Sequence, residues 1–365
     1  MDLGVSQAGF SVLASIEIDP FCCETLRARV EREQTETQII QEDIRNVDPV
    51  VLMNNLSLRS GDLALLFGGP PCQAFSQIGK RGSLLDERGL LLFEIIRFAD
   101  ALRPRAILVE QVKGLLNAPD AKGHGGGVFS RFLAELEDLG YSPKWRVINA
   151  AEYGLPQLRQ RVFIIATPKT NGFVFPPTTH GDQSKRSGLF PLLPYMTVGK
   201  ALRGLPRPAR GYKGAMPEHS HVDITPAGDR ARICGVPEGC HLAAQNHLPQ
   251  EQRQNLTKKD TTKFRRLSRN KPSLTLRCGE IFFHPTSVRY LTPREYMRLH
   301  GYPDDYLLRG PIRGRSGQVR YLDQHRQVAN SVPPPVARKL AEAIREMLLR
   351  LQLTSEAPTK ERKFA

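Results

Sequence analysis

The sequence has no run of about 18 or more apolar residues, which a membrane-spanning helix requires. It has only six cysteines in 365 residues, and their spacing is not typical of a disulfide framework. The N-terminus also shows no charged-then-apolar signal pattern. Together these absences favour a globular protein of a reducing cytoplasm that makes no contact with a membrane.

Metal-ligand pairs are scarce too. Cys234, Cys240 and His241 suggest a zinc site, but no second Cys or His pair lies at ligand spacing. We therefore expect no bound metal.

Acidic residues are the third shortage, with 37 Asp and Glu against 52 Lys and Arg, a net charge of +15 and a pI near 9.8. This excess indicates a polyanionic partner, usually nucleic acid, and the alternative is a basic enzyme without such a partner. Between residues 251 and 277 the basic residues face only two acids and are interleaved with Phe264 and Leu267. We predict phosphate contacts there, made by Lys258, Lys259, Lys263, Arg265, Arg266, Arg269 and Lys271.

Short apolar runs alternate with amphipathic stretches from residue 12 to about 168. The runs at 11–19, 62–67, 105–112 and 161–167 have the pattern of buried strands. This alternation predicts an α/β fold with a doubly wound, mostly parallel sheet, whose ligands gather at the carboxyl ends of the strands.

The chain is long enough for two domains. Beyond residue 170 it becomes rich in Pro, Gly, His and basic residues, which predicts a smaller second domain. At 292–295 a capping box opens a helix, and an apolar stripe from Val336 to Leu351 predicts a last helix that packs on the sheet. We expect a sheet domain (1–169), a smaller domain (170–288), a return to the sheet (289–353) and a frayed tail (354–365).

Three features could carry chemistry at the carboxyl edge of this sheet. Cys72 follows a predicted strand in the stretch Gly68 to Ser76, "GGPPCQAFS", whose prolines stiffen the loop and whose glycines allow close approach. Glu110 ends the neighbouring apolar run, where a carboxylate needs a partner or a function. Arg159 and Arg161 lie on the same side of an extended segment. Each signal is weak alone, and a buried structural cysteine remains the alternative for Cys72.

In combination these stretches resemble the DNA (cytosine-5) methyltransferase family. "GGPPCQAFS", "VEQV", "YGLPQLRQRVF", "RYLTPREYMRLHGYPDDY" and "QVANSVPPPVA" occur in the order and spacing of that family. The resemblance covers nearly the whole chain outside 170–270. It implies a Rossmann-like fold dependent on S-adenosylmethionine, and an enzyme that methylates carbon 5 of cytosine in a short DNA sequence.

The resemblance also implies roles for the catalytic residues. Cys72 would add to carbon 6 of a flipped-out cytosine, and Glu110 would hold or protonate N3. Arg159 and Arg161 would add electrostatic stabilisation. For the methyl donor it implies Glu17 at the ribose, Asp43 and Ile44 at the adenine, Pro71 and Leu91 along the methionine part, and Asn330, Ser331 and Val332 as a closing strip.

The chain departs from the family pattern at three places. Gln111 stands where the family usually has Asn, and Ala329 stands where it usually has Gly. The third departure is the first strand with its Phe-x-Gly-x-Gly cofactor loop, which would precede Met1. Either the true start lies upstream or this is a truncated copy, and the intact motifs favour an upstream start.

By resemblance, the partner is double-stranded DNA, read by residues 170–288 in the major groove. We expect a monomer of the bacterial cytoplasm, associated with the nucleoid and accompanied by a restriction endonuclease encoded nearby. Two alternatives stay open: methylation of cytosine in tRNA, and a catalytically impaired remnant that binds DNA without the methyl donor.

Overall fold

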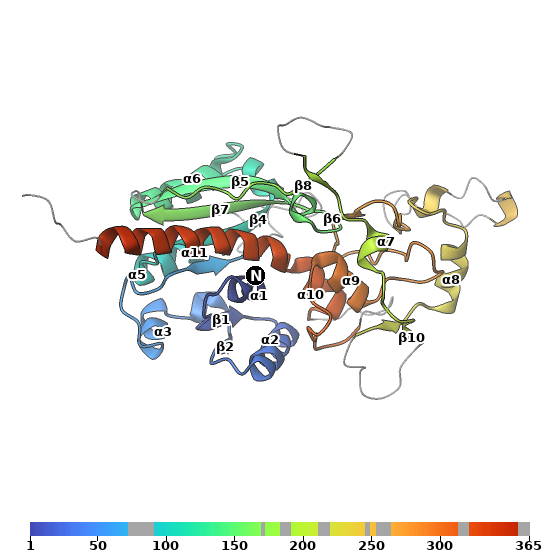
Figure 1. Ribbon diagram of the computed structural model, residues 1–365, viewed down its shortest axis with the longest axis horizontal. Coiled ribbons are helices and arrows are strands. Elements are labelled where there is room, and N and C mark those ends of the chain that lie inside the picture. Colours follow the sequence, from blue (N-terminus) through green and yellow to red (C-terminus); the bar gives the residue numbers. More distant parts are fainter. Residues whose placement is uncertain are drawn as a thin grey trace, which may run out of the picture.

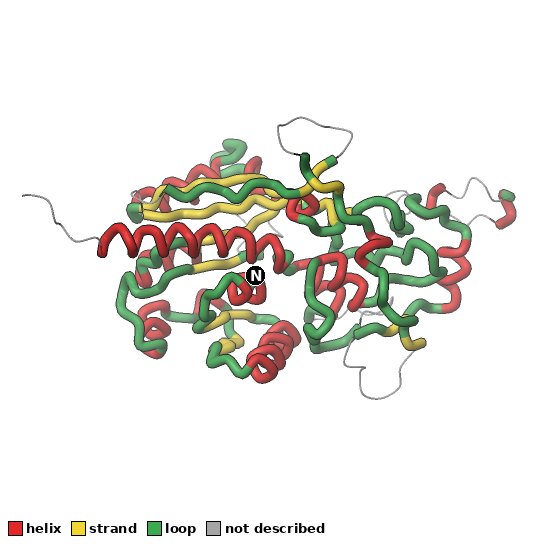
Figure 2. Tube along the Cα trace, in the orientation of Figure 1, coloured by secondary structure: helices red, strands yellow, loops and turns green. Residues whose placement is uncertain are grey.

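The computed structural model describes residues 1–71, 91–168, 172–182, 191–210, 220–244, 249–252, 264–312 and 321–356. These form two parts (Figure 1), which we call the sheet lobe (1–182 and 331–356) and the loop lobe (191–330). The loop lobe consists mostly of loops with short helices, as Figure 2 shows. The chain passes from the sheet lobe to the loop lobe after residue 182, later than the change of texture that the sequence shows after residue 168.

The main sheet has the strand order β3-β4-β7-β5. Its strands are β3 (Leu66–Gly68), β4 (Ile107–Val112), β7 (Gln160–Pro168) and β5 (Tyr141–Asn149). The β3–β4 pair is parallel, whereas β7 runs antiparallel to both β4 and β5. β4 is buried along most of its length, because Leu108 packs into the core on one face of the sheet while Ile107 and Val109 pack into the core on the other. The predicted α/β class is confirmed, with a larger antiparallel share than the sequence indicated.

A separate parallel pair is formed by β1 (Ala14–Glu17) and β2 (Gln38–Gln41). Ile16 of β1 and Leu66 of β3 pack in one core against α3 and α5, so the two strands share a layer. In the described part of the chain they are not paired with each other, and both stay half-buried. The sheet is thus divided between β1 and β3.

Helices cover both faces of the sheet lobe. The sheet lobe contains α1 (Asp2–Gln7), α2 (Pro20–Glu33), α3 (Pro49–Asn55), α5 (Glu94–Leu102), α6 (Gly127–Asp138) and α11 (Pro334–Glu356). On one face Val336, Leu340 and Ile344 of α11 join the core around Leu108 and Phe163, which confirms the predicted packing of the last helix. On the other face α5 and α6 pack against β4 and β7. α11 runs on to Glu356, past the predicted end at 353.

The loop lobe has a core of its own. Its helices are α7 (Val198–Ala201), α8 (Ala227–Cys234), α9 (Pro293–His300) and α10 (Gln324–Asn330). Short strands in the lobe and at its junction with the sheet lobe are β6 (Gln157–Leu158), β8 (His180–Gly181), β9 (Leu193–Pro194), β10 (Ala209–Arg210), β11 (Val222–Asp223) and β12 (Ser273–Leu274). The predicted capping box at Thr292 and Glu295 is confirmed at the start of α9. α9 and α10 share a core with Val198 and Phe282, so the return to the sheet is made by Val332 and α11.

A half-buried histidine in the loop lobe makes stability depend on pH. His284 Nδ1 accepts hydrogen bonds from the backbone of Thr286 and Ser287, at 3.2 and 3.0 Å, and burial lowers the pKa of His284 to about 4. The unfolded chain takes up this proton near pH 6.5, so stability is full above that pH and falls as the pH drops toward 4. The loss is at most about 3 kcal/mol.

We expect the His284→Gln variant to lose less stability than the wild type between pH 7 and pH 5, because glutamine keeps an acceptor and does not titrate. Urea unfolding at both pH values measures the difference. Equal losses in the two proteins would contradict this assignment.

Candidate active site

Gly69 and Glu110 emerge side by side because β3 and β4 are parallel. A Cβ placed on Gly69 would lie 3.6 Å from Glu110 Oε2 and 3.7 Å from Val332 Cγ2. The backbone at Gly69 therefore lies within van der Waals reach of both side chains. Cys72 lies outside the described residues, one position beyond Pro71 at the end of this loop.

Glu110 forms an ion pair with Arg161, with 3.0 Å between Oε1 and Nε. In the β4–β7 register Arg161 lies opposite Val112, which shares a face with Glu110, so its side chain reaches the carboxylate diagonally. Glu110 is 7% exposed, and Oε1 has no aligned hydrogen bond among the described residues despite the short ion-pair distance. The carboxylate is charge-balanced, yet one oxygen keeps the capacity to bond a ligand.

Gln111 fixes the loop that leads to Cys72. Its side chain is fully buried, Nε2 donates to the Pro70 carbonyl at 3.1 Å, and Oε1 accepts from the Val112 backbone at 2.8 Å. Both ends of the amide are therefore used. The glutamine, which departs from the family's usual asparagine, ties the end of β4 to the Pro-Pro turn.

Arg159 is directed at the C-terminal end of α10. Its guanidinium donates to the carbonyls of Ala329 and Ser331, both at 3.0 Å, and the residue is 2% exposed. It joins the strand that carries Arg161 to the predicted closing strip. Arg161 contacts Glu110 instead, so the two arginines bind different partners in the candidate site.

The predicted ribose ligand Glu17 ends β1. Its Oε1 accepts from the Asp19 backbone at 2.9 Å, and burial raises the pKa of the carboxyl group. The next side chain, Ile18, is 62% exposed, an apolar surface beside a carboxylate. The carboxylate can accept hydrogen bonds from the two hydroxyl groups of a ribose, and the apolar side chain beside it can contact a flat apolar ring.

Asp43 and Ile44 lie at the start of a short 3-10 helix, Ile44–Asn46, after β2. The Asp43 carboxylate is bonded by Arg45 Nη2 at 2.7 Å, which with the other Arg45 contacts lowers its pKa. The Ile44 carbonyl accepts from Arg97 Nη2 at 2.7 Å. These contacts hold the turn, and the Asp43 side chain remains partly exposed.

The strip Asn330–Val332 brings further predicted residues to the site. Asn330 is exposed at the end of α10, and its Oδ1 accepts from Cys278 Sγ at 2.6 Å. Val332 is buried beside Gly69. Pro71 is exposed at the end of the described loop, and Leu91 is half-buried where the description resumes.

The predicted phosphate contacts are only partly described. Lys258, Lys259 and Lys263 lie outside the described residues. Arg269 pairs with Glu238 at 3.0 Å, and Arg266 is half-buried and donates to the Ser287 carbonyl. Arg265 is half-buried, and Lys271 is exposed. A phosphate would have to compete with Glu238 for Arg269.

A second basic stretch lies outside the residues predicted from the sequence to contact phosphates. Lys200, Arg203, Arg207 and Arg210 are all exposed in the loop lobe, and no acidic residue lies between 198 and 210. That uninterrupted charge was a usable signal. Gln157 and His300 were not predicted as site residues either. No pattern in the sequence indicates their contact across the two lobes.

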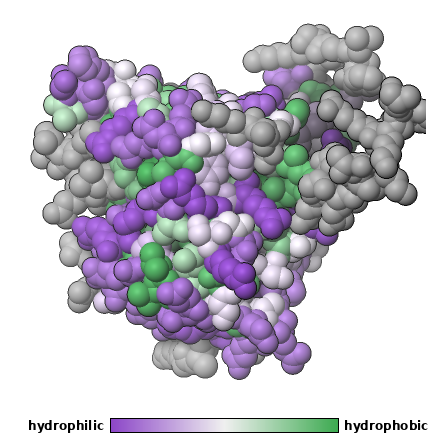
Figure 3. Space-filling model, turned by 90° about the vertical axis from the view of Figure 1, so that its left-hand side faces the viewer, coloured by the Kyte–Doolittle hydropathy of each residue, from purple (hydrophilic) through white to green (hydrophobic). Residues whose placement is uncertain are grey.

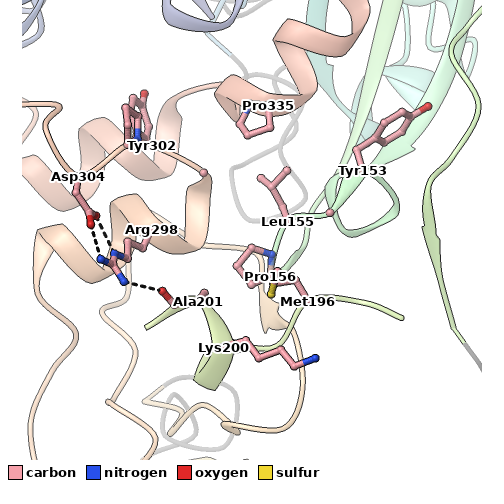
Figure 4. Close-up of a pocket in the computed structure, with 13 residues that line it drawn as sticks. Tyr153, Leu155, Pro156, Met196, Lys200, Ala201, Arg298, Tyr302, Asp304 and Pro335 are labelled. Carbon is pink, nitrogen blue, oxygen red and sulfur yellow. Dashed lines mark hydrogen bonds and ion pairs between the residues drawn. The ribbon is translucent and has the colours of Figure 1, made fainter. Parts of the chain in front are cut away.

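A groove of about 440 Å³ lies at the junction of the two lobes. Figure 4 shows Tyr153, Leu155 and Pro156 from the sheet lobe together with Met196 and Lys200 from the loop lobe in the lining of this groove. Arg298 at its rim is bonded to Asp304 and to the Ala201 carbonyl. None of the predicted site residues lines this groove, so it is separate from the candidate active site.

Other surfaces offer fewer features. On the end of the sheet lobe drawn in Figure 3, hydrophobic residues are scattered among hydrophilic ones. No group of three or more His, Cys, Asp or Glu within the described ranges could hold a metal ion. Nor does any described helix have the length and apolar character needed to cross a membrane.

Comparisons with known proteins agree on one family. A family model for C-5 cytosine-specific DNA methylases matches residues 1–346. The Type II methyltransferase M1.HphI of Haemophilus parahaemolyticus is 30% identical over 349 residues, which cover 94% of this chain and 83% of that protein. M.PspPI of a Psychrobacter species is 33% identical over 359 residues, covering 95% of this chain and 76% of that protein.

Solved structures show the same fold. A putative DNA modification methyltransferase encoded within an Escherichia coli prophage has a TM-score of 0.67 at 22% identity and covers 95% of both chains. The Dnmt2 methyltransferase of S. pombe has a TM-score of 0.59 at 15% identity, again over 95% of both chains.

Proposed function

The chain belongs to the C-5 cytosine-specific DNA methylase family and is a DNA cytosine-5 methyltransferase, and from this premise we propose how its own residues carry out the reaction. The observation that carries the proposal is the Glu110–Arg161 pair beside Gly69 and the Pro-Pro loop. It sets a carboxyl group, balanced by one arginine, next to the Pro-Pro segment that directly precedes Cys72 in the sequence.

We assign the nucleophile to Cys72. Carbon 5 of cytosine is a weak nucleophile, and addition of the thiolate at carbon 6 moves electron density toward carbon 5. Glu110, protonated for this step, gives its proton to N3 as negative charge develops on the ring. After carbon 5 has gained the methyl group, its proton passes to water and the bond between carbon 6 and sulfur breaks. N3 then returns its proton to Glu110, which restores the aromatic ring and the free thiolate.

The arginines have distinct parts in this proposal. The positive charge of Arg161 stabilises the negative carboxylate that forms when Glu110 gives its proton to N3. The ion pair also keeps this carboxylate in place. Arg159 adds its positive charge from a buried position and holds the Ala329 and Ser331 carbonyls. The base must leave the duplex to reach this edge, because a stacked cytosine is inaccessible to a thiol on a protein loop.

S-adenosylmethionine supplies the methyl group in this family. Glu17 and the exposed Ile18 fit its ribose and adenine, as argued above from their burial and chemistry. Asp43 and Ile44 would flank the adenine, and Pro71, Leu91 and Asn330–Val332 would border the methionine part. We propose no metal.

We propose double-stranded DNA as the substrate, held between the lobes and contacted by the loop lobe. The net charge of +15 and the exposed cations at 200–210 and at Lys271 support phosphate contacts. A monomer with a companion restriction endonuclease is consistent with the Type II names of the relatives. Transfer RNA as substrate is the second candidate, and the long basic variable region favours DNA over it.

The test is tritium transfer from labelled S-adenosylmethionine to duplex DNA and to tRNA by the purified chain, with bisulfite sequencing of DNA from expressing cells. We expect label in the DNA and none in the tRNA. We also expect cytosines that resist bisulfite conversion within one short sequence. Label only in tRNA would support the second candidate. A chain that binds DNA but neither binds S-adenosylmethionine nor transfers a methyl group would support the alternative of an impaired remnant.

A further inference from the structure

One backbone carbonyl receives hydrogen bonds from both lobes. Ser331 O accepts from Arg159 Nη2 at 3.0 Å and lies 3.0 Å from His300 Nε2. Arg159 precedes β7 in the sheet lobe, whereas His300 is the last residue of α9 in the loop lobe. The strip that begins at Asn330 is therefore held from two directions.

The contacts of Gln157 fix which ring nitrogen of His300 carries the proton. Gln157 Oε1 accepts from the Leu276 backbone at 3.2 Å, and its Nε2 donates to the Leu299 carbonyl at 3.2 Å, so the orientation of the amide is determined. The same Nε2 lies 3.0 Å from His300 Nδ1 and can only donate to it. The proton consequently sits on Nε2 and is donated to Ser331 O.

His300 stays neutral in this arrangement. It is fully buried, and burial, together with the nearby Arg159 charge, keeps the pKa of His300 well below its usual value. A neutral ring with one donor and one acceptor matches its two neighbours. The continuous path from Leu276 through Gln157 and His300 to Ser331 crosses between the lobes three times.

We propose that His300 is a positioning residue that holds the strip Asn330–Val332 in register with the Glu110–Arg161 pair. Arg159 fixes Ser331 O from the strand that carries Arg161, and His300 fixes it from α9. Val332 in turn borders Gly69 beside Glu110. The inference rests on the proposed function, in which this strip closes the methyl-donor site.

Packing alone does not explain a histidine at this position. If His300 were replaced by methionine, Ser331 O would keep its bond from Arg159, and Gln157 Nε2 would keep the Leu299 carbonyl. Each of these two atoms would keep one hydrogen bond, but one N–H of the buried Gln157 Nε2 would lose its acceptor, so a moderate loss of stability is expected. What disappears is the second restraint on the strip.

The test compares His300→Met and His300→Gln in the full chain. Glutamine can still donate from its own Nε2 to Ser331 O, and methionine cannot. His284→Met is the matched control, because it replaces a half-buried, hydrogen-bonded histidine of the loop lobe far along the chain from the strip. The readouts are calorimetric affinity for S-adenosylmethionine, hydrogen exchange of residues 329–333, single-turnover methyl transfer and melting temperature.

We expect His300→Met to weaken S-adenosylmethionine binding about five-fold or more, the effect of one hydrogen bond, and to speed exchange at 329–333. His300→Gln should stay within about two-fold of the wild type, and His284→Met should lower only the melting temperature. The proposal is overturned if His300→Met matches the wild type in affinity and exchange, or if His300→Gln is equally impaired. It is also overturned if His284→Met loses the same affinity.

Failure of the proposed function gives a different pattern. A wild-type chain that binds S-adenosylmethionine but transfers no methyl group to DNA would overturn the assigned activity, and the affinity and exchange comparisons would still decide the role of His300. A wild-type chain that binds no S-adenosylmethionine would overturn both.

Discussion

The Cys72→Ser variant should transfer no measurable methyl group to DNA and form no covalent complex with DNA that contains 5-fluorocytosine. A serine hydroxyl is almost entirely un-ionised near neutral pH, whereas a few per cent of an ordinary thiol is thiolate, and the thiolate is the attacking species. Without addition at carbon 6, carbon 5 stays too electron-poor to accept the methyl group. Fluorine at carbon 5 blocks the final elimination, so trapping reports the adduct directly.

The matched control is Cys234→Ser, which changes an exposed free thiol in the loop lobe. It should retain transfer and trapping. DNA binding and S-adenosylmethionine affinity of Cys72→Ser should remain, which would separate loss of chemistry from loss of fold. Trapping that persisted in Cys72→Ser would remove the nucleophile assignment.

The sequence predicted the elements whose residues decide their own structure. β4 and β7 coincide with long apolar runs in the sequence. α9 begins at a capping box, whose hydrogen bonds join residues only three positions apart. β2 and β5 escaped prediction because Gln38–Gln41 is short and polar at both ends, and Tyr141–Asn149 has exposed Lys, Trp and Arg in its middle. Their strand structure depends on pairing with β1 and β7.

The candidate site was predictable as a set of residues but not as a geometry. Parallel strands with polar ends indicated that the stretch carrying Cys72 and the residue Glu110 would both lie at the carboxyl edge of the sheet. The reach of Arg161 to Glu110 depends on the β4–β7 register, which no local pattern encodes. The meeting of Gln157, His300 and Ser331 depends on how two lobes pack, with residues about 140 and 30 positions apart in the chain.

The second large effect should come from Glu110→Gln, which we expect to lower the rate of methyl transfer by roughly a hundred- to ten-thousand-fold, the usual range for removing a general acid. Glutamine has a similar shape and its amide oxygen can still face Arg161 Nε, now 3.0 Å from Glu110 Oε1. It cannot supply a proton to N3 or balance the Arg161 charge. Single-turnover rates at saturating DNA and S-adenosylmethionine measure the effect.

Glu135→Gln is the matched control, because Glu135 pairs with Arg131 at 2.7 Å on the surface of α6. Such an exposed ion pair contributes at most about 1 kcal/mol, so this variant should keep its rate. Glu110→Gln should bind S-adenosylmethionine normally and trap fluorinated DNA slowly, since Cys72 remains while addition lacks its acid. A rate within ten-fold of the wild type would mean that N3 obtains its proton elsewhere, and Glu110 would then be only the anchor that holds Arg161.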